Sequence, residues 1–164
     1  MKRVAGILVL CVAALWPSPL RAGSASTSEG RQRAVETAKQ LEDDPLGAGA
    51  EERRAELLKW WTKVSDLTLT WCGNMLAGEL KNTDKDLAGA IYLQAPFSAG
   101  AAMIEHPEIA KDKRAFAIAG LEGALRAYQA AVSKDPSKRS LFLEGLSKEN
   151  ALGAYVDSKL PTCK

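Results

Sequence analysis

The only histidine of the chain, His106, stands between Glu105 and Glu108, and histidine is the side chain best suited to acid–base or metal chemistry near neutral pH. A zinc protease would need a second histidine in His-Glu-x-x-His, and a serine hydrolase would need Gly-x-Ser-x-Gly. The chain contains neither pattern. Because His106 also precedes Pro107, we expect it to cap a helix end or to meet solvent. We predict no catalytic residue, no metal ligand and no cofactor.

A second spacing with a chemical meaning is that of Asn82, Asp84 and Asp86, which match the first, third and fifth positions of a calcium-binding loop. The sixth position of such a loop is glycine and the twelfth is glutamate, but here they are Leu87 and Leu93. We therefore expect these polar residues to cap the start of a helix.

Three tryptophans that lie close together in the sequence, Trp60, Trp61 and Trp71, form a candidate binding surface. Clustered aromatic side chains bind sugars or apolar peptides, and Trp60 lies off the apolar stripe that contains Leu57 and Trp61. The alternative is that the tryptophans belong to the core or cover a disulfide. The sequence leaves both interpretations open.

The first 25 residues have the layout of a secretory signal peptide. Lys2 and Arg3 form a positive start, residues 4–16 an apolar run, and residues 17–25 a tail of mostly small residues. Cleavage is expected after Ala25 or Ala22. The apolar run is shorter than the span of about 20 residues that crosses a membrane. We therefore expect a secreted or periplasmic protein without membrane insertion after cleavage.

Cleavage would leave Cys72 and Cys163 as the only cysteines, because Cys11 lies in the apolar run. In an oxidising compartment we expect one disulfide between them, closing a loop of about 90 residues. The alternatives are two free buried thiols or an intermolecular bridge. The pair lacks the Cys-x-x-Cys spacing of a redox centre and the ligand number of a zinc site.

The charge balance argues against two classes of partner. The whole chain has 22 basic and 20 acidic residues, and loss of Lys2, Arg3 and Arg21 would leave 19 basic residues against 20 acidic ones. Such a nearly neutral chain has no electrostatic footprint for nucleic acid and no polybasic patch for a membrane surface. A protein partner remains the expected class, of unknown identity.

Helices must position these residues, because apolar residues recur at spacings of three and four and no hairpin turn occurs. The expected helices span residues 26–40, 50–64, 66–80, 84–105, 112–134, 136–146 and 149–160. The first has few apolar residues and is expected to be peripheral and frayed. Residues 66–80 also alternate like a short strand, but helix is preferred.

Two of these helices carry further expectations. In the helix over 50–64, the predicted buried face consists of Leu57, Leu58, Trp61 and Val64. In the helix over 84–105, Pro96 predicts either a kink or a break, and a kink is preferred because the apolar spacing continues beyond it.

The helix over 112–134 has two apolar seams. The first contains large residues, namely Ile118, Leu121, Leu125, Tyr128 and Val132. The second contains only small residues, namely Ala117, Gly120, Ala124, Ala127 and Ala131. Adjacent positions differ by about 100° around a helix, so we expect a central helix with a neighbour packed closely over the small seam.

Residues 124–132, Ala-Leu-Arg-Ala-Tyr-Gln-Ala-Ala-Val, are followed by Asp135-Pro136 and resemble the second helix of a tetratricopeptide repeat. The resemblance covers about residues 120–136 and has no second copy, whereas a stack of repeats takes about three. It implies an antiparallel helical hairpin.

Together these patterns predict an all-α protein, a compact bundle of six or seven helices packed as antiparallel hairpins with one disulfide. We expect a signal peptide over 1–25, a peripheral helix and linker over 26–48, and a helical domain over 49–164. The predicted function is an exported binding or scaffold protein that mediates protein–protein contact. The alternatives are an inhibitor or immunity-type protein against a secreted toxin, and a hydrolase that uses a carboxylate such as Glu105 or Glu122.

Overall fold

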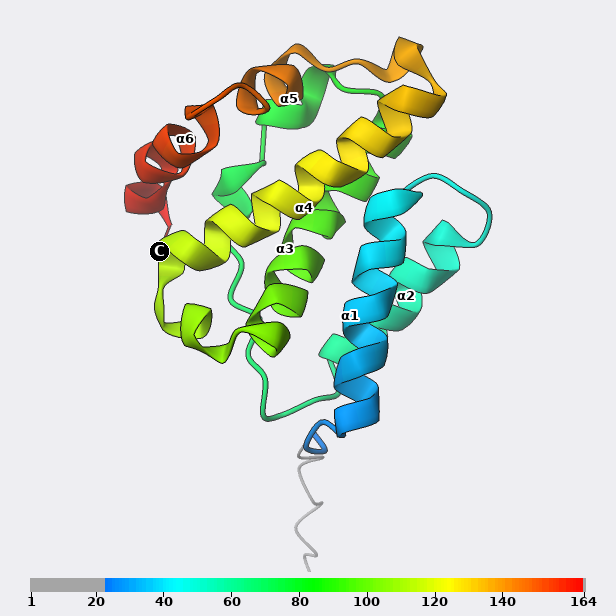
Figure 1. The fold of residues 1–164 in the computed structure, drawn as a ribbon, viewed down its shortest axis with the longest axis vertical. Helices are drawn as coiled ribbons and strands as arrows, with labels where there is room; N and C mark the ends of the chain where they lie inside the picture. Colours follow the sequence, from blue (N-terminus) through cyan, green and yellow to red (C-terminus); the bar gives the residue numbers. More distant parts are fainter. Residues whose placement is uncertain (1–22, 164) are drawn as a thin grey trace, which may run out of the picture.

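Two long helices, α3 (Lys85–Glu105) and α4 (Lys113–Lys134), cross at the centre of the molecule, and the other helices lie around them (Figure 1). The structure, a computed structural model, describes residues 23–163. Over these residues it has six α-helices, five short 3₁₀-helices and no strand. The all-α class is confirmed. Residues 1–22 of the predicted signal peptide lie outside the described residues.

The first helix, α1 (Ser28–Asp43), begins two residues later than expected. Its N-cap is Thr27, whose hydroxyl accepts a hydrogen bond from the Gly30 N–H at 3.0 Å. Ser26, the first residue of the expected helix, instead donates its N–H to Asp66 at 2.7 Å, and Arg31 pairs with the same carboxylate at 2.8 Å. These contacts fasten the start of α1 to the chain that follows α2.

The expectation of a peripheral, frayed α1 is wrong. The few apolar residues of this helix recur at spacings of three and four, so all of them fall on one face, and that face is buried against α3 and α4. The buried residues are Ala34, Val35, Ala38 and Leu41. The stripe is narrow but sufficient, because each of its four residues is at most 8% exposed.

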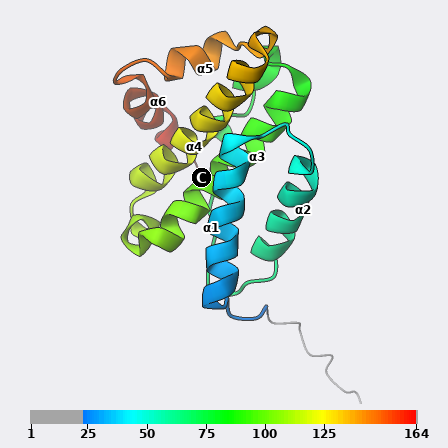
Figure 2. The ribbon, with the colours of Figure 1, turned by 45° about the vertical axis from the view of Figure 1, so that its right-hand side comes forward.

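The second helix, α2 (Ala50–Trp61), packs against α1 at the outer edge of the molecule (Figure 2). Leu57 and Trp61 are buried as expected, but Leu58 is 45% exposed, so its assignment to the buried face is wrong. Leu58 is adjacent to Leu57 and therefore points about 100° away from it, off the side that contacts α1.

The helix expected over residues 66–80 does not form. Residues 66–72 are extended, and two 3₁₀-helices follow, η1 (Gly73–Met75) and η2 (Glu79–Asn82). Along the extended stretch Leu67, Leu69 and Trp71 are half-buried while Thr68 and Thr70 are exposed, an alternation with the period of a strand. The only bridge among the described residues joins Ser24 to Val64, so the segment lies on the helices without pairing as a strand.

Helix α3 begins at a cap within the predicted acidic segment. The Asp84 carboxylate accepts the Leu87 N–H at 3.0 Å and pairs with Lys138 at 2.9 Å, which lowers the pKa of Asp84. The helix continues through Pro96, so the alternative of a break is excluded. By length and composition α3 could span a membrane, but 61% of its most apolar window is buried inside the protein, as in a core helix.

Helix α4 follows a 3₁₀ turn, η3 (Pro107–Lys111), and is capped by Asp112, which accepts two backbone N–H groups. The predicted two-sided packing is confirmed: every residue of the small seam is buried, and α3 is the neighbour packed closely upon it. A Cβ atom at Gly120 would lie within 3.0 Å of the Ala95 carbonyl oxygen of α3. The seam therefore sets how closely α3 and α4 approach.

The helix expected over 136–146 is divided into η4 (Pro136–Lys138) and α5 (Leu141–Leu146). Ser140, at the division, donates its N–H to the Tyr128 hydroxyl at 2.9 Å, and its own hydroxyl bonds that of Thr83 at 2.9 Å. These tertiary bonds take the place of a continuous helix. The chain ends with α6 (Ala151–Lys159) and η5 (Leu160–Thr162), on the opposite side of α3 and α4 from α2 (Figure 1).

A buried polar network joins α1, α3 and α4. Glu42, 7% exposed, receives two hydrogen bonds from the Arg126 guanidinium, at 2.6 and 3.0 Å, and one from the Ser98 hydroxyl at 2.6 Å. Gln94 donates to both Ser98 and the Ala38 carbonyl oxygen. Because a carboxylate withdrawn from water needs such partners, this network fixes how α1 sits on the other two helices.

We predict that Gly123→Ala destabilises the protein by about 1 to 3 kcal/mol, the usual cost of overpacking. A Cβ atom at this position would fall within 3.0 Å of the Ser98 side chain and of a Glu42 oxygen. Gly89→Ala is the matched control, since it lies inside α3 with nothing within 4 Å of the added atom, and it should stabilise by about 0.5 to 1 kcal/mol. Denaturant unfolding of both variants measures the contrast, and equal stabilities would contradict the close approach of the helices.

The Asp66→Asn variant is expected to lose a pH-dependent part of the free energy of unfolding. The Ser26 N–H, together with the hydroxyl of Ser26 and the guanidinium of Arg31, lowers the pKa of Asp66 to about 2 in the folded protein. A carboxyl whose folded pKa is depressed stabilises the fold above its unfolded pKa, near 4, and this contribution disappears as the pH falls toward 2. The difference in free energy of unfolding between wild type and variant should therefore shrink between pH 4 and pH 2. A difference that stays constant over this range would show that Asp66 makes no such contribution.

Candidate functional site

The predicted disulfide between Cys72 and Cys163 is present, with the two Cα atoms 5.6 Å apart. It ties the end of the chain to the extended segment before η1. Neighbouring hydrogen bonds reinforce the attachment: the Tyr155 hydroxyl donates to the Met75 carbonyl oxygen at 2.6 Å, and the Asn74 amide donates to the Thr162 carbonyl oxygen at 3.1 Å. Burial raises the pKa of Tyr155, so its hydroxyl stays a donor.

A cavity of about 230 Å³ lies beside this disulfide. Its lining comes from four separate parts of the chain: the segment from residue 68 through η1, the end of α3, the start of α4 with the preceding turn, and the C-terminal residues. The lining residues are Thr68, Thr70, Trp71, Cys72, Met75, Met103, Ala110, Lys113, Phe116, Ala117, Leu160 and Cys163. The buried members are apolar, whereas Thr68, Thr70, Ala110 and Lys113 are exposed, so the cavity has an apolar floor and a polar mouth.

The polar groups of this cavity are donors and a cation. Lys113 is the only ionisable side chain in the lining, because both cysteines are oxidised, and it forms no ion pair with another described residue. The indole N–H of Trp71 is buried and has no hydrogen-bond acceptor among the described protein atoms. A buried donor without a partner costs about 1 to 3 kcal/mol. The cavity therefore offers positive charge and hydrogen-bond donors around apolar side chains.

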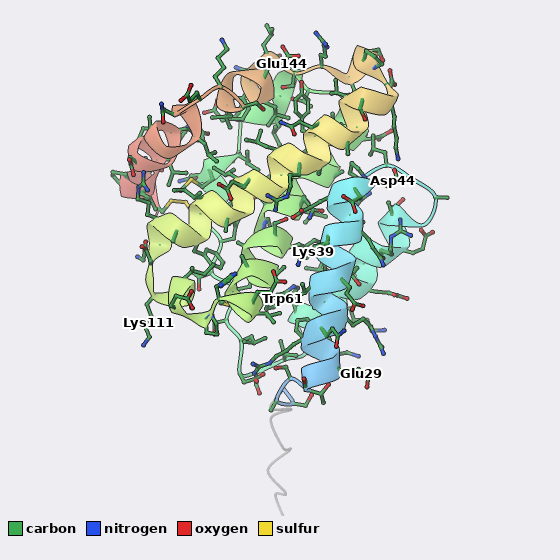
Figure 3. The ribbon with its side chains drawn as sticks, viewed as in Figure 1. Glu29, Lys39, Asp44, Trp61, Lys111 and Glu144 are labelled. Carbon is green, nitrogen blue, oxygen red and sulfur yellow. A yellow bond between two sulfur atoms is a disulfide. The ribbon has the colours of Figure 1, made fainter. Side chains whose placement is uncertain are left out.

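The three tryptophans do not share one surface. Trp61 is 8% exposed and lies between α1 and α3, where its ring fills the space above Gly100 (Figure 3). Trp60 packs edge to face on Trp61, with ring centroids 4.9 Å apart. Trp71 packs against both hydrophobic clusters of the core and alone reaches the cavity. The structure thus brings together Trp71 and the disulfide, and separates them from the other two.

A second hollow, a groove of about 850 Å³, lies between α2 and the first half of α3. Its apolar surface comes from both helices and the turn before α2, namely Leu46, Ala50, Ala55, Leu58, Gly89, Ala90 and Leu93. Glu51 and Glu52 on α2 and Asp86 on α3 line its rim, and none of the three forms an ion pair within the described part of the chain. Lys85 is the one cation there without a hydrogen bond or ion pair of its own to a described residue.

Two other candidates from the sequence, His106 and Asp84, line neither hollow. His106 is exposed at the end of α3, with its Nδ1 3.6 Å from a Glu108 oxygen, and lines neither hollow. Within residues 23–163, no group of three or more histidine, cysteine, aspartate or glutamate side chains is arranged to hold a metal ion. Asp84 acts as the helix cap described above.

The two carboxylates proposed for a hydrolase have other surroundings. Glu105 pairs with Lys39 at 2.5 Å, Glu122 is exposed on α4, and neither lines the cavity or the groove. A general acid requires a raised carboxyl pKa, yet the carboxylates whose pKa is shifted, such as Asp157 beside Arg114, have it lowered by hydrogen bonds and cations. Nothing in this geometry assembles an acid and a base around one space.

Comparison with protein-family models, with curated proteins and with solved structures gives no match. The α3–α4 pair has the helical hairpin arrangement that the tetratricopeptide resemblance implied. The resemblance supports nothing beyond this hairpin. The residues that sequence reasoning missed are Lys113, Met103 and Phe116 of the cavity. The sequence contains only a weak indication of these residues, because the cavity is formed by four segments that are distant in the chain. No local residue spacing shows that these segments meet.

Replacing both Cys72 and Cys163 by alanine is expected to lower the stability by about 4 to 5 kcal/mol. The bond closes a loop with a sequence separation of 91, and the chain-entropy model assigns this cost to a loop of that length. The midpoint of denaturant unfolding measures the loss, and reduction of the wild type should reproduce most of it. A double variant that unfolds at the wild-type midpoint would show that the bridge contributes nothing.

Proposed function

We propose that this protein is an exported binding protein, and that the groove between α2 and α3 receives an amphipathic helix of a partner protein. The observation that carries the proposal is Leu58. Its sequence spacing is that of a core residue, yet it is 45% exposed and lines the groove. A helix laid between α2 and α3 would bury Leu58 together with Leu93 and supply the packing that α2 lacks on this side.

The shape of the site fits recognition of a helix. Groove-binding helices place apolar residues at spacings of three and four between two helices of the receptor. Here α2 packs mainly on α1, so the side of α2 that faces α3 remains open, and Gly89 leaves space at the surface of α3. A partner helix with small and branched apolar residues on one face has the required form.

The charge of the rim indicates the partner's polar face. Three acids of the lining, Glu51, Glu52 and Asp86, form no ion pair within the described residues, against two such cations, Arg54 and Lys85. Opposite charge on a partner steers association and sets orientation more than it adds affinity. We therefore expect lysines or arginines flanking the apolar face of the bound helix.

Export is part of the proposal. Support comes from the layout of residues 1–25, which is that of a signal peptide, and from the disulfide, since such bonds persist mainly in oxidising compartments. The partner would then be another exported protein or the exterior part of a membrane protein. The identity of the partner would show whether this protein acts as a scaffold or as an inhibitor of a secreted toxin.

A photo-crosslinking amino acid at Leu58 is expected to capture the partner in the native cell. The same amino acid at Leu141, which is 90% exposed on α5 and does not line the groove, is the matched control and should capture nothing. Mass spectrometry of the Leu58 product should identify a helical segment with basic flanks. Equal labelling from both positions, or none from Leu58, would contradict the proposed site.

A synthetic peptide of the crosslinked segment then gives the affinity. Leu58→Asp should weaken its binding at least about tenfold, because a charge would face the buried side of the peptide. Leu141→Asp should leave the affinity unchanged. Raising the salt concentration should slow association, since the rim charges act at long range. Unchanged affinity for Leu58→Asp would overturn the groove as the docking site.

A further inference from the structure

We infer that the cavity beside the Cys72–Cys163 disulfide binds a small carboxylic acid with an apolar body about the size of one aromatic ring. This cavity shares no residue with the groove between α2 and α3, so the inference is independent of the proposed function. It rests on three features of the cavity: its size, the sign of its charge and its unused donors.

Size limits the ligand. An apolar cavity of about 150 Å³ in another protein holds benzene, and sites for drug-sized ligands begin near 300 Å³. The volume of about 230 Å³ found here lies between these values and has room for one ring or a short acyl chain with its head group. Met75, Met103 and Phe116 form the buried floor, and methionine side chains adapt readily to the shape of an aromatic or aliphatic guest.

Charge selects an anion. No acidic side chain lines the cavity, and Lys113, the single charged residue of the lining, has no carboxylate within 4.0 Å among the described residues. By contrast, the next residue along α4, Arg114, forms an ion pair with Asp157 at 2.6 Å. Lys113 is therefore free to pair with a ligand at the mouth of the cavity.

The neutral polar groups also suit a carboxylate, which only accepts hydrogen bonds. The hydroxyls of Thr68 and Thr70 form no hydrogen bond with the described residues, and the Trp71 indole N–H lacks an acceptor. Both threonines, like Lys113, line the cavity and are exposed to solvent. A carboxylate at the mouth would meet a cation and hydroxyl donors while its apolar body occupies the floor.

Benzoate is the probe, with benzyl alcohol as its neutral counterpart. Titration of the purified wild-type protein, followed by NMR, should shift the Trp71 indole N–H resonance saturably, and a Trp71→Phe spectrum assigns that resonance. Lys113→Met should lower the affinity for benzoate about fivefold, which corresponds to the loss of one partly exposed ion pair, and should leave the affinity for benzyl alcohol unchanged. Lys111→Met is the matched control: this exposed lysine precedes α4, does not line the cavity and should not alter either affinity (Figure 3).

A blocking variant tests the location. Ala110→Phe places a ring at the mouth from an exposed position, so the fold should be retained while both ligands lose binding. Denaturant unfolding checks that its stability matches that of the wild type. Absence of a saturable Trp71 shift at millimolar benzoate would overturn the inference, as would equal benzoate affinity in Lys113→Met or in a folded Ala110→Phe protein.

Discussion

The close approach of α3 and α4 is the constraint on which the rest of the structure depends. Gly120 faces the backbone of α3, and Gly123 faces Ser98 and the carboxylate of Glu42, so at both points a single methyl group would collide. Because the crossing is made of small residues, it leaves no room there for large apolar side chains. These collect instead in two clusters, one beneath η1, α5 and α6 and the other between α1, α2 and the end of α3.

The same crossing explains why a charged residue is buried. Glu42 sits where α1 meets the other two helices, and the Arg126 guanidinium and Ser98 hydroxyl satisfy its oxygens. Only Glu42 is buried, since the Arg126 side chain is 55% exposed. A buried carboxylate without partners is costly, so the network favours the register of α1 in which Ser98 and Arg126 reach Glu42. Gly123 is the residue that makes space for it.

Both candidate sites lie where the elements around this crossing fail to pack fully. At one side, the disulfide draws the C-terminal residues over the extended segment and the start of α4, and the space between them is the cavity. At the other side, α2 packs mainly on α1 and contacts α3 through Trp61 at its end, and the space left between α2 and the first half of α3 is the groove. Each space offers shape and a few placed charges, which are what the proposed binding needs.

The sequence by itself determined the elements whose signals are local. Helices α3 and α4 follow from long apolar periodicity and acidic caps, and the small seam of α4 already indicated a close neighbour. The disulfide followed from counting cysteines once Cys11 was assigned to the leader. Tertiary structure decided the rest, because the deciding contacts join distant residues. Residues 66–72 are extended because Trp71 packs across both clusters, and the chain bends at Ser140 because Tyr128 and Thr83 bond it there. Leu58 is exposed because it points away from α1, the helix on which α2 mainly packs. The cavity and the groove belong to this second group, since each is a space between segments that only the packing of the helices brings together.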